Sequence, residues 1–280
     1  MHGVELKSAR ELERMRRAGL IVWVAHRVVC HAIRPGCTTA QLNQLVERVL
    51  EAFGAEPLFL GVPGPAGPFP AVSCISVNEQ LVHGIPGPRT LQDGDIVSVD
   101  IGCRFDGWCG DSAWTYPVGQ IDARCQKLLE VTRRTLELAL EELPRQQFWR
   151  PIARRMAQYV ESQGFSVVRE FSGHGIGRRM HEPPQVPNYV DRSLRLHDIR
   201  IVPGLVVAIE PMVNAGSRAV RMLPDGWTIV TADGQPCAHF EHTVARTDTG
   251  IWILTGAPQT PDEDAFVRPV LEKFVTESAD

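Results

Sequence analysis

The sequence predicts an α+β protein built from two similar halves, each made of helices followed by strands. Helical and strand-like patterns alternate along the chain in the order helices, strands, helices, strands. The segments Asp93–Asp100 and Pro203–Glu210 can be laid over each other, because each has a turn glycine six residues before a carboxylate. With 280 residues, 44% of them hydrophobic, the chain is long enough to bury a substantial core.

Composition excludes several classes of protein. The 29 Lys and Arg against 33 Asp and Glu give a net charge of −4, and no basic run exceeds two residues, which argues against a dedicated nucleic-acid or anionic-membrane binder. Apolar runs fall far short of the roughly 20 residues that span a bilayer. The charged N-terminus is unlike a secretory signal, which predicts a cytoplasmic protein. Seven cysteines without a CxxC pair are expected to be reduced and mostly buried.

Two helices are expected in the first half. Ser8 to Glu11 form a capping box that opens a helical pattern running toward Pro35. Thr38 to Gln41 open a second helix, which ends at Gly54. The segment 61–70 holds four prolines and three glycines, so it is expected to be a loop, either a linker or one wall of a pocket.

Strands and further helices follow in order. Strand-like runs are expected at 72–77, 95–103 and 109–116, helices at 121–143 and 152–163, and further strands at 165–171, 205–210, 228–231 and 240–246. Near the C-terminus, Thr260 as N-cap and Pro261 as first helical residue predict a terminal helix.

Two acids meet across the hairpin that the Asp106-Gly107 dipeptide predicts. A two-residue turn there pairs residue i with residue 213 − i, so Asp100 lies opposite Ala113. Asp111 shares the face of Ala113, which makes Asp100 and Asp111 diagonal neighbours with Cβ atoms about 7 to 8 Å apart. Both carboxylates can then bind one cation.

Two more carboxylates lie in or beside strands. Glu210 closes an apolar strand and is followed by a proline, and Glu241 lies within a strand-like run. Buried ionised acids need compensation. Lysine is absent from 128 to 272, so metal ions are favoured over lysine pairing, with arginine as the open alternative.

Histidines fall into two groups. Gly173–His181 is glycine-rich and carries two histidines, His174 and His181, which flexible backbone could bring close together. It lacks the Lys-Ser/Thr of a phosphate loop. Four histidines have no motif around them and are expected at the surface or at helix caps: His2, His26, His31 and His197.

At this point the chain resembles the type I methionine aminopeptidases, peptidases of family M24, over about residues 5 to 252. The resemblance is carried by Cys74-Ile-Ser-Val-Asn-Glu79, Val82-His-Gly-Ile-Pro86, Val99-Asp-Ile-Gly102, Gly110-Asp-Ser112, Gly173-His-Gly-Ile-Gly177, His181-Glu-Pro-Pro-Gln185, Ile209-Glu-Pro-Met-Val-Asn-Ala-Gly216, Asp225-Gly-Trp227 and Glu241-His-Thr243. It implies one catalytic domain over 1–280 with the pita-bread fold, in which two pseudo-symmetric halves (about 5–120 and 121–252) pack helices on a curved antiparallel sheet. The tail 253–280 is expected to be helical.

The resemblance also implies a set of site residues. Five residues are the implied ligands of a dinuclear metal centre, with the second and last bridging: Asp100, Asp111, His174, Glu210 and Glu241. His83, His181 and Glu210 are the implied catalytic groups. Substrate binding is assigned to His83, His181, Cys74, Phe69 and Trp227. The chain departs from the family at Met180, where Phe is common, and at Phe240, where Tyr is frequent.

The implied activity is that of a methionyl aminopeptidase. Such an enzyme uses two divalent ions (Co, Mn, Fe or Zn) and a metal-bridging hydroxide to remove an N-terminal methionine that precedes a small residue. Nascent polypeptide N-termini are the implied partners, with transient ribosome contact and a monomeric state. Two alternatives stay open: an X-Pro aminopeptidase or prolidase-like enzyme of the same fold, and a metal-free peptide-binding module.

Overall fold

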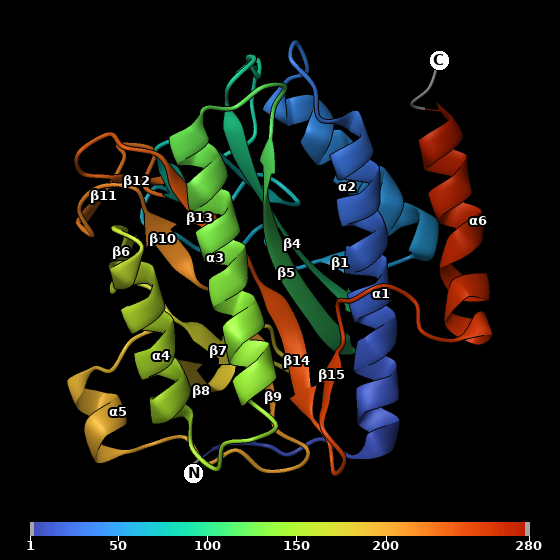
Figure 1. Ribbon diagram of the computed structural model, residues 1–280. Coiled ribbons are helices and arrows are strands. Elements are labelled where there is room, and N and C mark those ends of the chain that lie inside the picture. The colour runs from blue at the N-terminus through green and yellow to red at the C-terminus, as the bar shows by residue number, and fades with distance from the viewer. Residues whose placement is uncertain (1–2, 278–280) are drawn as a thin grey trace.

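The computed structural model describes residues 3–277 and confirms the α+β class (Figure 1). His2 and residues 278–280 lie outside the described residues. Helices α1 (Ala9–Ala32) and α2 (Thr39–Phe53) belong to the first half, and α3 (Ala123–Glu142) and α4 (Trp149–Ser162) to the second. In Figure 1 the two helix pairs lie in front of the strands, on either side of the molecule. The short α5 (Arg192–Leu196) and the C-terminal α6 (Pro261–Glu277) complete the described helices.

The predicted helix caps are present. The Ser8 backbone N–H donates to Glu11 Oε2 at 2.9 Å, which closes the capping box of α1. Thr38 Oγ1 accepts from the Gln41 N–H at 3.2 Å, and Gln41 Oε1 accepts from the Thr38 N–H at 2.8 Å. Gly54 ends α2 with a left-handed φ of 66°, a conformation that glycine adopts without strain.

The first sheet is centred on the predicted hairpin. Strands β4 (Ile96–Phe105) and β5 (Trp108–Pro117) pair antiparallel with Asp100 opposite Ala113, so the predicted register is confirmed. Asp106 and Gly107 have φ of 50° and 77°, as a two-residue hairpin turn requires. Strand β4 also pairs with β1 (Glu56–Pro57) and β2 (Cys74–Val77).

The second half contributes a five-stranded antiparallel sheet and a three-stranded sheet, and it shares a further three-stranded sheet with strand β3 of the first half. The five-stranded order is β15 (Ile251–Ile253), β14 (His242–Arg246), β9 (Val206–Ile209), β7 (Gly173–Gly175) and β8 (Glu182–Val186). The three-stranded sheets are β13 (Cys237–His239), β10 (Met212–Asn214) and β6 (Ser166–Val167), and β11 (Val220–Met222), β12 (Ile229–Thr231) and β3 (Gln80–Val82).

Polar contacts between β5 and β14 join the two halves. The Asp111 N–H donates to Thr243 Oγ1 at 3.1 Å, and the Thr243 hydroxyl donates to the Asp111 carbonyl at 2.8 Å. The Glu241 N–H donates to the carbonyl of Ala113 at 2.7 Å. The two strands lie side by side near the middle of Figure 1. This junction brings acids of the two halves together.

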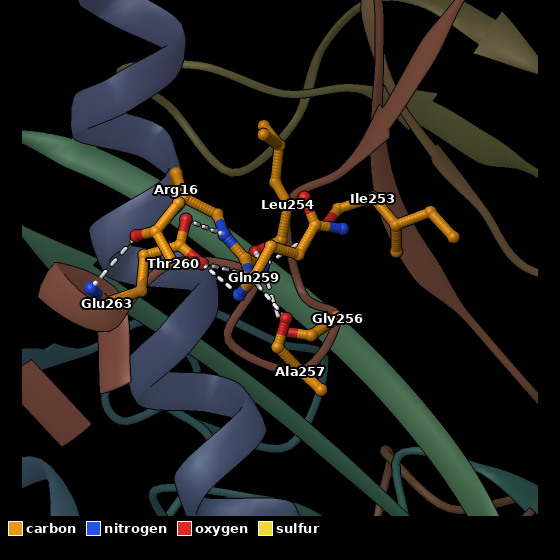
Figure 2. A network of polar contacts seen from close by, with 8 residues as sticks. All are labelled: Arg16, Ile253, Leu254, Gly256, Ala257, Gln259, Thr260 and Glu263. Atoms are coloured by element: carbon orange, nitrogen blue, oxygen red, sulfur yellow. Dashed lines mark hydrogen bonds and ion pairs between the residues drawn. The ribbon is translucent and has the colours of Figure 1, made fainter. Parts of the chain in front are cut away.

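The C-terminal helix packs against α1 and is tied to it by a buried arginine (Figure 2). The side chain of Arg16 on α1 bonds Glu263 on α6 and the carbonyls of the preceding turn. Thr260 Oγ1 accepts from the Glu263 N–H at 3.2 Å, which confirms the predicted cap. Residues 253–260 therefore hold α6 against the rest of the fold.

Some expectations were wrong. Only Ser166–Val167 of the segment 165–171 forms a strand, and α4 begins three residues before 152, because Trp149 is buried against the core. His26 is not at the surface: it is 5% exposed on the inner face of α1. Five of the seven cysteines are buried and all seven are free thiols, as predicted. Within residues 3–277 no helix is long and apolar enough to cross a membrane.

Candidate metal centre

Every residue assigned to the site from the sequence lines one cavity of about 260 Å³ between the two halves. Those residues are Phe69, Cys74, His83, Asp100, Asp111, His174, His181, Glu210, Trp227 and Glu241. The acids and His174 gather in one part of it, and apolar and aromatic side chains form the remaining wall. The cavity therefore offers a charged region beside a hydrophobic slot.

The hairpin positions the first two acids. Asp100 and Asp111 are diagonal neighbours on one face, because Gly102 is the residue paired with Asp111. A Cβ on Gly102 would lie 3.2 Å from Asp111 Oδ1, so the glycine leaves room for this carboxylate. Asp111 is 4% exposed.

His174 is presented by strand β7 rather than by a flexible loop. Its neighbouring glycines allow close packing: a Cβ on Gly173 would lie 2.3 Å from the Ala208 carbonyl oxygen, and one on Gly175 2.2 Å from that of Pro183. The expectation of flexible backbone was therefore wrong for this strand. His174 Nδ1 lies 2.9 Å from the Gly175 carbonyl oxygen, which can only accept, so Nδ1 carries the hydrogen and Nε2 keeps its lone pair.

That lone pair faces two carboxylates. His174 Nε2 lies 3.6 Å from Glu210 Oε1 and 3.8 Å from Asp111 Oδ2. Burial, together with His181 nearby, lowers the pKa of His174 to about 4, so the ring is neutral near pH 7. A lone pair opposed to carboxylate oxygens is unfavourable unless a cation lies between them.

Glu210 and Glu241 come from the second half. Glu210 directly follows β9, and its backbone carbonyl accepts from Asn188 Nδ2 at 2.9 Å. Glu241 lies between β13 and β14, and its carbonyl accepts from the Ser112 hydroxyl at 2.6 Å. Both backbones are therefore held to their neighbours while the carboxylates point into the cavity.

The electrostatics of this region favour the binding of positive charge. Burial and the neighbouring acids raise the pKa of Asp100, Glu210 and Glu241 well above the usual carboxyl range. Burial also raises the pKa of Asp111 to about 7. Within residues 3–277, three buried oxygens of these acids have no hydrogen-bond partner: Asp100 Oδ1, Asp111 Oδ1 and Glu241 Oε1. Among the described residues no lysine or arginine lines the cavity, so the arginine alternative is excluded.

The donor set fits divalent cations. Ligand atoms of Asp111, His174 and Glu241 all lie within 4.8 Å of one another, and one of the three comes from the first half of the chain. Carboxylate oxygens and one imidazole nitrogen are ligands that suit Mn, Fe or Co, whereas a structural zinc site is typically built from thiolates. The residues therefore could hold metal ions.

Two histidines flank this region. His83 has a left-handed φ of 57°, uncommon for a residue with a side chain, and its ring meets those of Phe171 and Trp227 edge-on at 5.7 and 6.3 Å. Burial lowers the pKa of His83 to about 4. The ring of His181 lies 4.3 Å from that of His174. Neutral imidazoles at these places can donate hydrogen bonds to a bound ligand.

The hydrophobic slot is walled by the loop 61–70. Phe69 meets the Trp227 ring edge-on at 5.1 Å, and Trp227 Nε1 donates to the Gly67 carbonyl at 3.1 Å. Of the two departures from the family pattern, Met180 lines the cavity. Phe240 instead packs on Trp114 at 5.1 Å in the core, away from the cavity. Only Met180 can therefore affect the shape of the slot.

His239 was missed by the sequence reasoning. It is 2% exposed, lines the cavity and places Nε2 3.6 Å from Glu210 Oε2. Strand alternation could have found it, because His239 lies two residues before Glu241 and therefore on the same face.

Comparisons with known proteins agree with this geometry. The model of metallopeptidase family M24 matches residues 13–248. "Methionine aminopeptidase 1" of Bacillus subtilis (strain 168) is 51% identical over 249 residues, which is 89% of this chain and 98% of that protein.

Solved structures show the same fold. The crystal structure of methionine aminopeptidase from Thermotoga maritima superposes with a TM-score of 0.85 at 40% identity, over 91% of this chain and all of that one. Prolidase from Pyrococcus furiosus reaches a TM-score of 0.69 at 18% identity, and the match covers only 66% of its chain. The prolidase likeness concerns the fold alone, and the fold is the pita-bread arrangement expected from the sequence.

Proposed function

The chain belongs to metallopeptidase family M24, and from this premise we propose that it removes the N-terminal methionine from peptides and proteins whose second residue is small. This is the activity of a methionine aminopeptidase, the name carried by relatives that match nearly their whole length to this chain. The X-Pro alternative has support only from fold similarity at low identity. In a metal-free binding module, no cation would compensate the burial of four acids around an unprotonated imidazole nitrogen.

One observation carries the proposal. The His174 lone pair and the unpartnered oxygens of Asp111 and Glu241 converge on one place at the bottom of a slot lined by apolar side chains. Cations would stabilise the ionised form of this group, and the slot beside it suits an extended thioether side chain.

We assign Asp100, Asp111, His174, Glu210 and Glu241 as the residues that would hold two divalent ions, either Co, Mn, Fe or Zn. Two ions are proposed because four carboxylates exceed what a single divalent charge balances. When bound, the ions supply Lewis acidity that lowers the pKa of water and polarises a peptide carbonyl.

The side chains of the chain supply the remaining chemistry. Glu210 accepts a proton from the attacking water and passes it to the departing amine nitrogen, because its carboxylate lines the cavity with one oxygen 3.6 Å from His174 Nε2 and the other 3.6 Å from His239 Nε2. His83 and His181 donate hydrogen bonds to the substrate carbonyl oxygen as charge develops on it.

Substrate selection follows from the slot. Phe69, Cys74 and Trp227 contact the methionine side chain, and Met180 completes this wall. The slot lies beside the ion site, so a methionine side chain in the slot places the free α-amine next to that site, which explains action at the first bond only. We infer that nascent polypeptides in the cytoplasm are the substrates and that the chain acts as a monomer, with transient contact to the ribosome.

The test is hydrolysis of Met-Ala-Ser and Ala-Pro by metal-stripped protein reloaded with Mn²⁺ or Co²⁺, beside an Asp111→Asn variant. We expect metal-dependent release of methionine that the variant loses, while Ala-Pro is not cleaved. Cleavage of Ala-Pro instead would move the chain to the proline-directed enzymes. If folded, metal-loaded protein cleaves neither peptide, this result would favour a binding module.

A further inference from the structure

His239 is a buried polar group that the proposed mechanism does not use. Its ring lines the cavity, its residue is 2% exposed, and Nε2 has no hydrogen-bond partner among the described residues. An unpartnered buried nitrogen costs about 1–3 kcal/mol. We therefore expect His239 Nε2 to have a hydrogen-bond partner in the active enzyme.

The backbone of His239 is fixed by its neighbours. Its N–H donates to Thr115 Oγ1 at 2.9 Å, and its carbonyl accepts from the same hydroxyl at 2.9 Å. It also pairs with Met212 in the ladder between β13 and β10. Because two neighbouring strands, β5 and β10, hold the backbone of this residue, the fold sets the position of its ring.

The carboxylate that lies near this nitrogen belongs to Glu210. Among the described residues, His239 Nε2 and Glu210 Oε2 are 3.6 Å apart, the same separation as between His174 Nε2 and Glu210 Oε1. One imidazole therefore lies beside each oxygen of Glu210. A small rotation of either side chain brings the His239 pair within hydrogen-bonding distance.

The two imidazoles differ in role. His174 uses Nδ1–H on the Gly175 carbonyl and presents a lone pair, and it belongs to the group of three ligand atoms within 4.8 Å of one another. His239 is not in that group, which is the only such group among residues 3–277. Where no cation lies between an imidazole nitrogen and a carboxylate oxygen, their contact is favourable only if the nitrogen donates a hydrogen bond.

We propose that His239 is a positioning residue for the reaction, whose Nε2–H donates to Glu210 Oε2 and holds that carboxylate in the orientation required for proton transfer. The inference rests on the proposed function, because Glu210 is the proton carrier there. Residues that orient metal ligands typically affect metal affinity or activity by about 10- to 100-fold.

The test uses two substitutions of His239 in the full chain. His239→Leu removes the donor at similar size, and His239→Gln keeps an amide donor. We expect His239→Leu to lower kcat for Met-Ala-Ser by about 10- to 100-fold with little change in KM. His239→Gln should recover most of that loss. Unchanged kcat in His239→Leu, or no recovery in His239→Gln, would overturn the inference.

A second readout does not depend on turnover. Calorimetric titration of metal-stripped protein with Mn²⁺ should show about 10-fold weaker binding for His239→Leu, with the number of bound ions unchanged. In a Glu210→Ala background the same substitution should have no further effect on affinity, because the hydrogen-bond acceptor is absent. Equal losses in both backgrounds, or one fewer bound ion, would show that His239 acts independently of Glu210 and contradict the proposal.

Two controls separate the possible failures. If wild-type protein binds Mn²⁺ but releases no methionine, the proposed function fails, while the affinity cycle still tests the His239–Glu210 contact. If His239→Leu does not fold, as judged by circular dichroism, His239→Ala replaces it under the same criteria, and the comparison with His239→Gln stays decisive.

Discussion

Arg16 on α1 and Glu263 on α6 form a two-point ion pair, with Arg16 Nε 2.8 Å from Glu263 Oε1 and Nη2 2.9 Å from Oε2. Arg16 is 2% exposed, and its remaining hydrogens are directed at backbone carbonyls (Figure 2). Those carbonyls belong to Ile253, Leu254, Gly256 and Ala257. Helix α6 lies beyond the residues 13–248 that the family model matches, so this pair joins the additional helix to the shared core.

Glu263→Gln should destabilise the protein by up to about 3 kcal/mol, because a buried guanidinium loses its counter-charge. The measurement is the urea midpoint of the metal-free protein. The control is Glu141→Gln, which breaks the solvent-exposed contact with Arg134 on α3 and should leave the midpoint almost unchanged. Equal shifts for the two substitutions would contradict the structural role of the buried pair.

A second buried pair, between Lys7 and Glu182, holds the N-terminal segment against β8. Lys7 Nζ lies 2.9 Å from Glu182 Oε2, and the side chains are 3% and 5% exposed. Lys7→Met leaves a buried carboxylate without its partner and should cost about 3–5 kcal/mol of unfolding free energy.

A double variant checks this prediction. In Lys7→Met with Glu182→Gln both charges are absent, so the total loss should be smaller than the sum of the two single losses. Urea unfolding of the four proteins gives the coupling. Strict additivity would show that the two side chains do not stabilise each other.

Acid should destabilise the protein through His26. His26 Nε2 lies 2.9 Å from the Ser112 carbonyl oxygen, which only accepts, so Nε2 carries the hydrogen and Nδ1 accepts from the Tyr116 hydroxyl at 3.0 Å. Burial lowers the pKa of His26 from 6.5 to about 4. Between pH 4 and 6.5 the unfolded chain therefore binds more protons than the folded chain, and stability rises with pH across this window.

Replacing His26 isolates this effect. The contribution is complete above pH 6.5 and falls by at most about 3 kcal/mol as the pH decreases to 4. His26→Gln removes the titrating group, so its unfolding free energy should depend less steeply on pH across this window. Parallel pH profiles for the wild type and the variant would contradict the assignment.

Local geometry explains which parts of the site the sequence could predict. The Asp106-Gly107 turn sets the register of its own hairpin, so the diagonal of Asp100 and Asp111 follows from a short stretch of chain. Strand β7 was not predicted, because Gly173 and Gly175 have low strand propensity and are needed only where other backbones pass close to them. Strand β8 was not predicted, because Pro183 and Pro184 cannot donate to a strand ladder.

Contacts between distant segments determine the features that the sequence did not predict. Lys7 and Glu182 are separated by 175 residues, and nothing near either residue indicates its partner. The contact between His239 and Glu210 likewise joins separate segments, although strand alternation places His239 on the same face as Glu241. His26 could have been placed correctly, because it lies four residues after Val22 and three before Val29, on the buried face of α1.

The wall of the methionine slot depends on Gly64. A Cβ at this position would lie 2.1 Å from Cζ2 and 2.4 Å from Cε2 of Trp227, far inside contact distance. Trp227 cannot yield easily, because its Nε1 is bonded to Gly67 and its ring packs on Phe69. Gly64→Ala must therefore displace either the indole ring or the loop 61–70.

Gly64→Ala should raise KM for Met-Ala-Ser by roughly tenfold or more, since hydrophobic slots typically lose about 1–3 kcal/mol when one methylene no longer fits. The effect on kcat should be smaller, because the slot binds substrate and transition state alike. Gly87→Ala is the matched control: an added Cβ there meets nothing within 4 Å and needs no left-handed backbone. Because both substitutions add one methyl group, an unchanged KM in Gly64→Ala would mean that Trp227 does not shape the slot.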